Sequence, residues 1–115
     1  MRAATGILRA GAMAFCVASG ITGTSAQTND KQVRAGREFA TTRCAMCHAL
    51  GSTGSSPHKS APPFRDVAHR YPVASLAEAF AEGITVGHKD MPEFVLDQAE
   101  IDALLAFLES FAPRK

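Results

Sequence analysis

The feature that most constrains this chain is a run of five residues, CAMCH, at positions 44–48. Two thiols that are two residues apart can form thioether bonds to the two vinyl groups along one edge of a porphyrin, and the adjoining imidazole can then reach the iron. The spacing therefore predicts that Cys44, Cys47 and His48 attach one c-type haem, with His48 as the proximal iron ligand. A chain of 115 residues has room for one compact domain around it.

A pair of cysteines with this spacing also occurs in two other kinds of site. A redox-active dithiol of the thioredoxin type would follow a strand in a βαβ pattern, which the sequence does not show. A structural zinc site would need a second ligand pair, and His58, His69 and His88 have no paired spacing. A chance occurrence of the pattern also remains an alternative, because only three of its five positions are restricted. The N-terminal segment favours the haem, because it directs the chain to the compartment where bacteria attach haem.

The first 26 residues have the pattern of a secretory signal peptide. Arg2 and Arg9 accompany an apolar run over positions 10–21, and small residues at positions 24–26 precede the expected cleavage site. The apolar run is shorter than the roughly 20 residues of a spanning helix and contains a Ser-Gly pair, so a retained anchor is disfavoured. We therefore expect residues 1–26 to be removed, which leaves residues 27–115 as one domain in the periplasm, without a stable membrane anchor.

Removal of this segment changes the charge and the cysteine count. The full chain has 12 Lys and Arg against 11 Asp and Glu, and loss of Arg2 and Arg9 leaves 10 basic residues against the same 11 acids. Such a balance gives no reason to expect binding to nucleic acid or to a charged membrane surface. Cys16 also leaves, so the mature chain keeps only the two cysteines of the motif.

Outside the motif the sequence predicts an all-α fold of about four short helices. The first covers positions 30–42, with Asn29 or Asp30 as its cap, and the second covers positions 64–71 and ends at Pro72. Two capping boxes, SLAE at 75–78 and DQAE at 97–100, begin the third and fourth helices, which end near Gly83 and Pro113. The Gly-, Ser- and Pro-rich stretch at 50–63 is predicted to be a loop.

The apolar residues of these helices lie on one face of each. Examples are Val33, Phe39 and Ala40 in the first helix, and Ile101, Leu104, Leu105, Leu108 and Phe111 in the last. In so short a chain these faces must share one core, wrapped around the haem. Gly36 lies inside the first helix, where glycine costs about 1 kcal/mol relative to alanine, so we expect a close helix crossing there.

The candidate for the distal iron ligand is Met91. It lies in GHKDMPEF, at positions 87–94, in a loop between two predicted helices where Pro92 limits the backbone. A thioether is a soft, neutral ligand that favours ferrous iron and raises its potential. Burial of Met91 as packing is the alternative, and His88 is a second candidate ligand. Met46 cannot reach the distal face from between the cysteines, and His58 and His69 are expected to be surface groups.

With these motifs the mature chain resembles the class I cytochromes c, small soluble electron carriers. The segment GREFA at 36–40 is similar to the N-terminal helix of the family, and residues 101–111 to its C-terminal helix, which crosses the first. The segment APPF at 61–64 resembles the one whose backbone carbonyl accepts a hydrogen bond from the proximal histidine, with Pro62 and Pro63 both candidates. The resemblance implies the cytochrome c fold, one haem c and a distal ligand at Met91.

From these residues we expect a periplasmic one-electron carrier of a respiratory chain. With both axial positions filled, the iron has no open site for substrate, so we expect an electron-transfer protein and not an enzyme. Redox partners, such as an oxidase, a reductase or a dehydrogenase, are expected to bind weakly at the haem edge near the cysteines, and the chain to be a monomer or weakly associating. A bound haem subunit of a multi-subunit oxidoreductase, and a ligand-binding or peroxidatic haem protein, remain alternatives.

Overall fold

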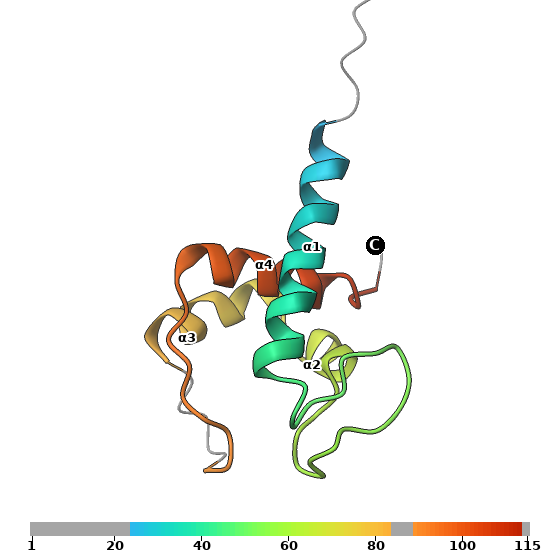
Figure 1. Ribbon diagram of the computed structural model, residues 1–115, viewed down its shortest axis with the longest axis vertical. Helices are drawn as coiled ribbons and strands as arrows, with labels where there is room; N and C mark the ends of the chain where they lie inside the picture. The colour runs from blue at the N-terminus through green and yellow to red at the C-terminus, as the bar shows by residue number, and fades with distance from the viewer. Residues whose placement is uncertain (1–23, 84–88, 114–115) are drawn as a thin grey trace, which may run out of the picture.

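The computed structural model describes residues 24–83 and 89–113, and within them the fold is all-α, as predicted (Figure 1). Its elements are α1 (Thr24–Arg43), α2 (Phe64–Arg70), a short 3-10 helix η1 (Val73–Ser75), α3 (Leu76–Glu82) and α4 (Gln98–Glu109). Among the described residues, none of the helices has both the length and the apolar character that crossing a bilayer requires. The predicted number of helices is confirmed.

Helix α1 begins earlier than predicted. It starts at Thr24, so Asn29 and Asp30 lie inside the helix and the prediction that one of them caps it is wrong. The residues from 24 to 30 include no proline or glycine, and their moderate helix propensities allow the helix to continue toward the N-terminus. Residues 1–23, most of the expected signal peptide, lie outside the described residues, and positions 24–26 form the first turn of α1.

Helices α2 and α3 occupy the predicted segments, but α3 begins differently. Tyr71, which precedes Pro72, has extended backbone angles (φ −125°, ψ 142°), as expected for a residue before proline, and ends α2. The predicted SLAE capping box is not formed, because Ser75 already has helical angles (φ −70°, ψ −13°) at the end of η1 and its side chain makes no capping hydrogen bond. Helix α3 ends at Glu82 and is followed by Gly83, whose φ of 94° favours glycine.

Helix α4 begins with the predicted capping box and supplies most of the core. The Glu100 backbone N–H donates to Asp97 Oδ1 at 2.8 Å, and the Asp97 backbone N–H donates to Glu100 Oε2 at 3.1 Å. Its buried face carries Ile101, Leu104, Phe107 and Leu108. The other buried apolar residues come from the rest of the chain and pack around this face: Ala40, Phe64, Ala68, Val73, Phe80 and Leu96.

Helices α1 and α4 cross at Gly36, which confirms the predicted close approach (Figure 1). A Cβ atom at Gly36 would lie 2.6 Å from the carbonyl carbon of Ala103 and 2.8 Å from the Cβ of Phe107, and closer still to the Ala103 oxygen. The glycine is therefore required by packing. The crossing places the C-terminal end of α1, and the CAMCH motif after it, beside the core (Figure 1).

Candidate functional site

The CAMCH motif folds as a tight turn directly after α1. The backbone N–H of Cys44 donates to the carbonyl of Ala40 at 2.8 Å, and the N–H groups of Cys47 and His48 both donate to the carbonyl of Cys44, at 3.1 and 2.9 Å. These bonds hold the three predicted site residues on one turn of backbone. The structure therefore brings Cys44, Cys47 and His48 together on a segment that directly follows the packed helix α1 and is hydrogen-bonded to it.

The imidazole of His48 is oriented by two neighbours. Its Nδ1 lies 2.7 Å from the carbonyl oxygen of Pro62, so Nδ1–H donates to that oxygen and Nε2 is left as the nitrogen that can bind a metal. The ring also makes an edge contact with Phe64, with centroids 5.5 Å apart. Of the two prolines that the sequence left open, Pro62 is thus the one that supports His48.

The loop that carries Pro62 is tied to the motif by several hydrogen bonds. The backbone N–H of Phe64 donates to the carbonyl of Ala49 at 3.0 Å, and the N–H of Ala49 donates to Ser56 Oγ at 3.0 Å. The Arg65 guanidinium donates to the carbonyls of Gly51 (3.2 Å) and Gly54 (2.8 Å). Phe64 and Arg65 therefore support the site, although sequence reasoning assigned them no role there. The adjacent APPF segment was the signal that could have found Phe64.

The two cysteines carry free, half-buried thiols. Burial raises the pKa of Cys44 to about 11; Arg43 nearby lowers it, and Cys47 raises it further. Cys44 is therefore a neutral thiol near pH 7. Within the described residues no three His, Cys, Asp or Glu side chains cluster as a metal site.

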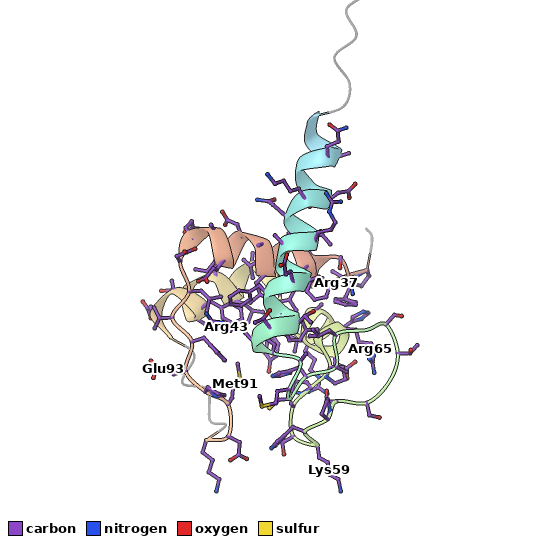
Figure 2. The ribbon with its side chains drawn as sticks, in the orientation of Figure 1. Arg37, Arg43, Lys59, Arg65, Met91 and Glu93 are labelled. Carbon is purple, nitrogen blue, oxygen red and sulfur yellow. The ribbon has the colours of Figure 1, made fainter. Side chains whose placement is uncertain are left out.

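Met91 lies on the segment between α3 and α4. Figure 1 shows that this segment and the loop between α1 and α2 extend to the same side of the helices. Met91 is partly buried, and its side chain points toward the body of the molecule (Figure 2). The C-terminal end of the segment is held, because the backbone N–H of Leu96 donates to the Phe80 carbonyl at 3.0 Å and the capping box of α4 follows. His88 and Gly87 lie outside the described residues.

The remaining candidates make no described side-chain contact with the cysteines or with His48. Met46 is 86% exposed, as expected for a residue that cannot turn inward from between the cysteines. His69 is an exposed residue, and its Nε2 donates to the Phe111 carbonyl at 3.1 Å, so it holds the end of the chain against α2. His58 is partly exposed and lies 3.8 Å from Asp90.

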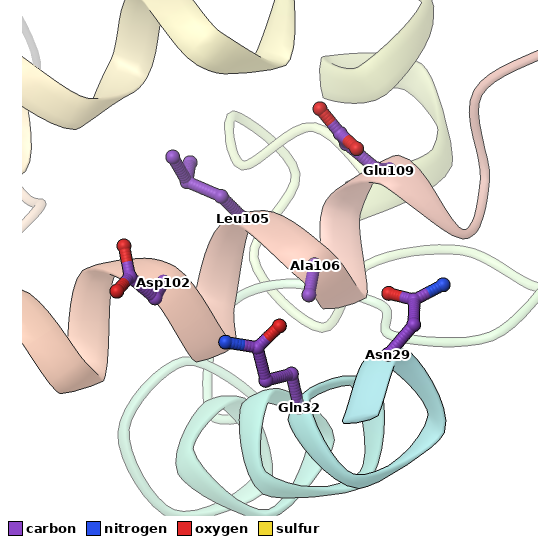
Figure 3. Close-up of a pocket in the computed structure, with 6 residues that line it drawn as sticks. All are labelled: Asn29, Gln32, Asp102, Leu105, Ala106 and Glu109. Carbon is purple, nitrogen blue, oxygen red and sulfur yellow. The ribbon is translucent and has the colours of Figure 1, made fainter. Parts of the chain in front are cut away.

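A shallow cavity of about 270 Å³ lies elsewhere, between the first half of α1 and α4 (Figure 3). Its lining is mainly polar: Asn29, Gln32, Asp102, Leu105, Ala106 and Glu109. None of these residues belongs to the predicted haem site, which begins at the opposite end of α1. The cavity therefore has no part in the candidate site.

The residues on the proximal side fit a covalently attached haem. Two free thiols and a histidine whose Nε2 is available share one turn, and buried Phe64 and Phe107, with ring centroids 6.1 Å apart, extend an apolar surface behind the histidine. This donor set is the one that thioether attachment and iron ligation require.

Comparison with known proteins identifies the family. The family model described as Cytochrome c matches residues 33–112, which include the CAMCH motif, the Pro62 carbonyl and Met91. No curated protein and no solved structure matches the chain. Because the match covers well over half of the chain, and because the cysteines and histidine of the motif lie on one turn as haem attachment requires, this protein belongs to the cytochrome c family and binds one covalently attached haem c.

Proposed function

We propose that this cytochrome c carries single electrons between redox partner proteins in the periplasm, through a haem iron held by His48 and Met91. The observation that carries the proposal is the hydrogen bond of 2.7 Å between His48 Nδ1 and the Pro62 carbonyl. It leaves Nε2 available as the proximal ligand, on the turn that carries both thiols. Met91 is favoured as the distal ligand because its segment lies on the same side of the helices as the loop between α1 and α2 and is anchored at its C-terminal end.

The haem supplies the one-electron couple of its iron, and the residues of the chain set the conditions under which it works. The Pro62 carbonyl fixes the ring of His48 and makes its free nitrogen a stronger donor to a metal. Phe64, Phe107 and Leu104 keep one side of the site apolar. Packed and hydrogen-bonded surroundings limit how far the ligands move when the charge on the iron changes, and a small rearrangement favours fast electron transfer.

Partner proteins are proposed to bind beside the two cysteines. Met46 lies between them and is 86% exposed, so the backbone that attaches the haem is itself at the surface. A small apolar contact of this kind suits a weak, quickly released interface, which a mobile carrier needs. If the protein were instead a permanent subunit of an oxidoreductase, it would co-purify with a large partner protein at high salt.

The export proposal predicts a mature protein that begins at Gln27. Cleavage after Ala26 removes three residues of α1, and the first residues that remain, Gln27 and Asn29, are exposed and outside the core. We therefore expect the cleaved protein to keep its fold. N-terminal sequencing of haem-containing protein from the periplasmic fraction tests this, and a chain that still begins at Met1 would contradict it.

Met91→Ala is expected to remove the distal ligand and leave the fold intact. Ferric protein with sulfur bound to iron has a weak absorption band near the red end of the visible spectrum. We expect the wild-type protein to have this band and to bind carbon monoxide poorly when reduced. The Met91→Ala protein should lose the band, bind carbon monoxide rapidly and have a lower potential, because water or a harder ligand replaces the thioether.

Met46→Ala is the matched control, since it removes a methionine that is 86% exposed. Its band and its carbon monoxide binding should equal those of the wild-type protein. If the wild-type ferric protein lacks the band and Met91→Ala changes neither property, Met91 is a packing residue and the proposed ligation is wrong.

A further inference from the structure

We propose that His58 and Asp90 form a clamp that positions Met91, by joining the segment that carries the distal ligand to the segment that attaches the haem. The inference rests on the proposed function, since it assigns a role relative to Met91 as ligand. His58 Nε2 lies 3.8 Å from Asp90 Oδ2. Asp90 immediately precedes Met91, whereas His58 belongs to the loop between α1 and α2.

His58 is attached to the haem-binding motif by its own backbone. Its N–H donates to the carbonyl of Cys47 at 3.2 Å, so its position is defined by the turn that holds the thiols. The contact with Asp90 therefore joins the proximal side of the site to the distal side through one residue. The other described contacts hold the Met91 segment from its C-terminal side, where Glu93 lies against Gly83, Phe94 packs against the core and Leu96 is hydrogen-bonded to Phe80.

The ring of His58 is oriented for this contact. The backbone N–H of Ser60 donates to His58 Nδ1 at 3.2 Å. Because Nδ1 accepts this bond, Nε2 is the nitrogen that carries the hydrogen, and Nε2 is the atom that faces the carboxylate of Asp90. The tautomer is thus set by the backbone of the loop itself.

The charges of the surrounding chain also favour the approach of the segment that carries Met91 to the loop that carries His58. The charged residues from 31 to 70 are mainly basic, and those from 78 to 109 are mainly acidic. Figure 2 shows Lys59 on the loop between α1 and α2, Arg65 in α2, and Glu93 beside Met91 on the segment before α4. Exposure limits the strength of the pair, since the side chains of His58 and Asp90 are 39% and 62% exposed.

The test measures how often Met91 leaves the iron. Imidazole can bind the ferric holoprotein only after the thioether has left, so its binding rate reports the population of the open segment. His58→Ala and Asp90→Asn should each raise this rate about two- to five-fold, as expected for loss of a partly exposed pair. The double variant should be no faster than either single variant, because both remove the same contact.

Rescue and controls separate the clamp from a general effect on the fold. His58→Lys places a positively charged donor opposite Asp90 and should return the rate toward that of the wild-type protein. Glu109→Gln, which removes a carboxylate from the far end of α4, should leave the rate unchanged. Additive effects in the double variant, or no effect of His58→Ala in a protein with the sulfur band, would overturn the clamp and leave the proposed function standing.

A second measurement applies if the proposed ligation itself fails. Hydrogen exchange at the backbone amides of Asp90 and Met91 in the holoprotein reports opening of the segment whatever the distal ligand is. His58→Ala should speed this exchange by the same two- to five-fold factor. Absence of the band in the wild-type protein would reject Met91 as ligand, whereas unchanged exchange at these amides would reject the clamp.

Discussion

The His48→Ala protein is expected to yield no stable holoprotein. The ring of His48 is the group placed by the Pro62 carbonyl and by the edge of Phe64, and no other described histidine lies on the turn with the thiols. Without it the iron loses its proximal ligand. The apoprotein should also lose most of its fixed tertiary structure, because a domain of this size buries little apolar surface without the haem, and binding stabilises the folded state.

The cysteine variants test the two predicted thioether bonds separately and together. Cys44→Ala or Cys47→Ala removes one thioether and should reduce the yield of attached haem, and the double variant should remove attachment completely. Denaturing gel electrophoresis with a haem stain measures this directly. His69→Ala is the control, since His69 is exposed and bonds only the Phe111 carbonyl among the described contacts, and it should stain like the wild-type protein. Stain on the double cysteine variant would rule out thioether attachment.

Gly36→Ala is expected to destabilise the protein strongly, although alanine is the better helix former. The new Cβ would meet the backbone of Ala103 and the Cβ of Phe107 at the crossing of α1 and α4. Backbone cannot move aside as the end of a flexible side chain can, so the two helices must separate. Overpacking of this kind costs about 1–3 kcal/mol, and contact with a carbonyl group places Gly36→Ala at the upper end of that range.

Whether Gly36→Ala lowers or raises the stability of the protein shows which dominates, the close helix crossing or helix propensity. Propensity alone would make Gly36→Ala more stable by about 1 kcal/mol, so an increase in the midpoint of denaturant unfolding would contradict the close crossing. Gly51→Ala is the matched control, because Gly51 is exposed and its nearest neighbour would lie 3.4 Å from the new Cβ, an ordinary contact distance. It should not lower the stability of the holoprotein.

Features that depend on residues close together in the sequence could be predicted from the sequence. The end of α2 before Pro72 and the capping box of α4 were predicted and confirmed. Each depends on bonds within about one turn of backbone, so residue spacing nearly determines it. The same reasoning failed at SLAE, because the 3-10 turn that precedes α3 gave Ser75 helical angles that a capping residue does not have.

Features that depend on contacts between distant segments were decided only by the tertiary structure. Pro62 and Pro63 are adjacent and chemically alike, and only the path of the loop beside His48 shows that the Pro62 carbonyl accepts its hydrogen bond. His58 looked like a surface group because nothing near it in the sequence reveals Asp90, 32 positions later. Gly36 lies between these two cases: an unfavourable glycine within a helix predicts a close contact, but the partner, the backbone of Ala103, becomes known only when α4 crosses α1. The physical reason is how far apart in the sequence the contacting residues are. Residue spacing along the chain specifies local hydrogen bonds, whereas contacts between distant segments follow from how the buried faces of the helices pack together.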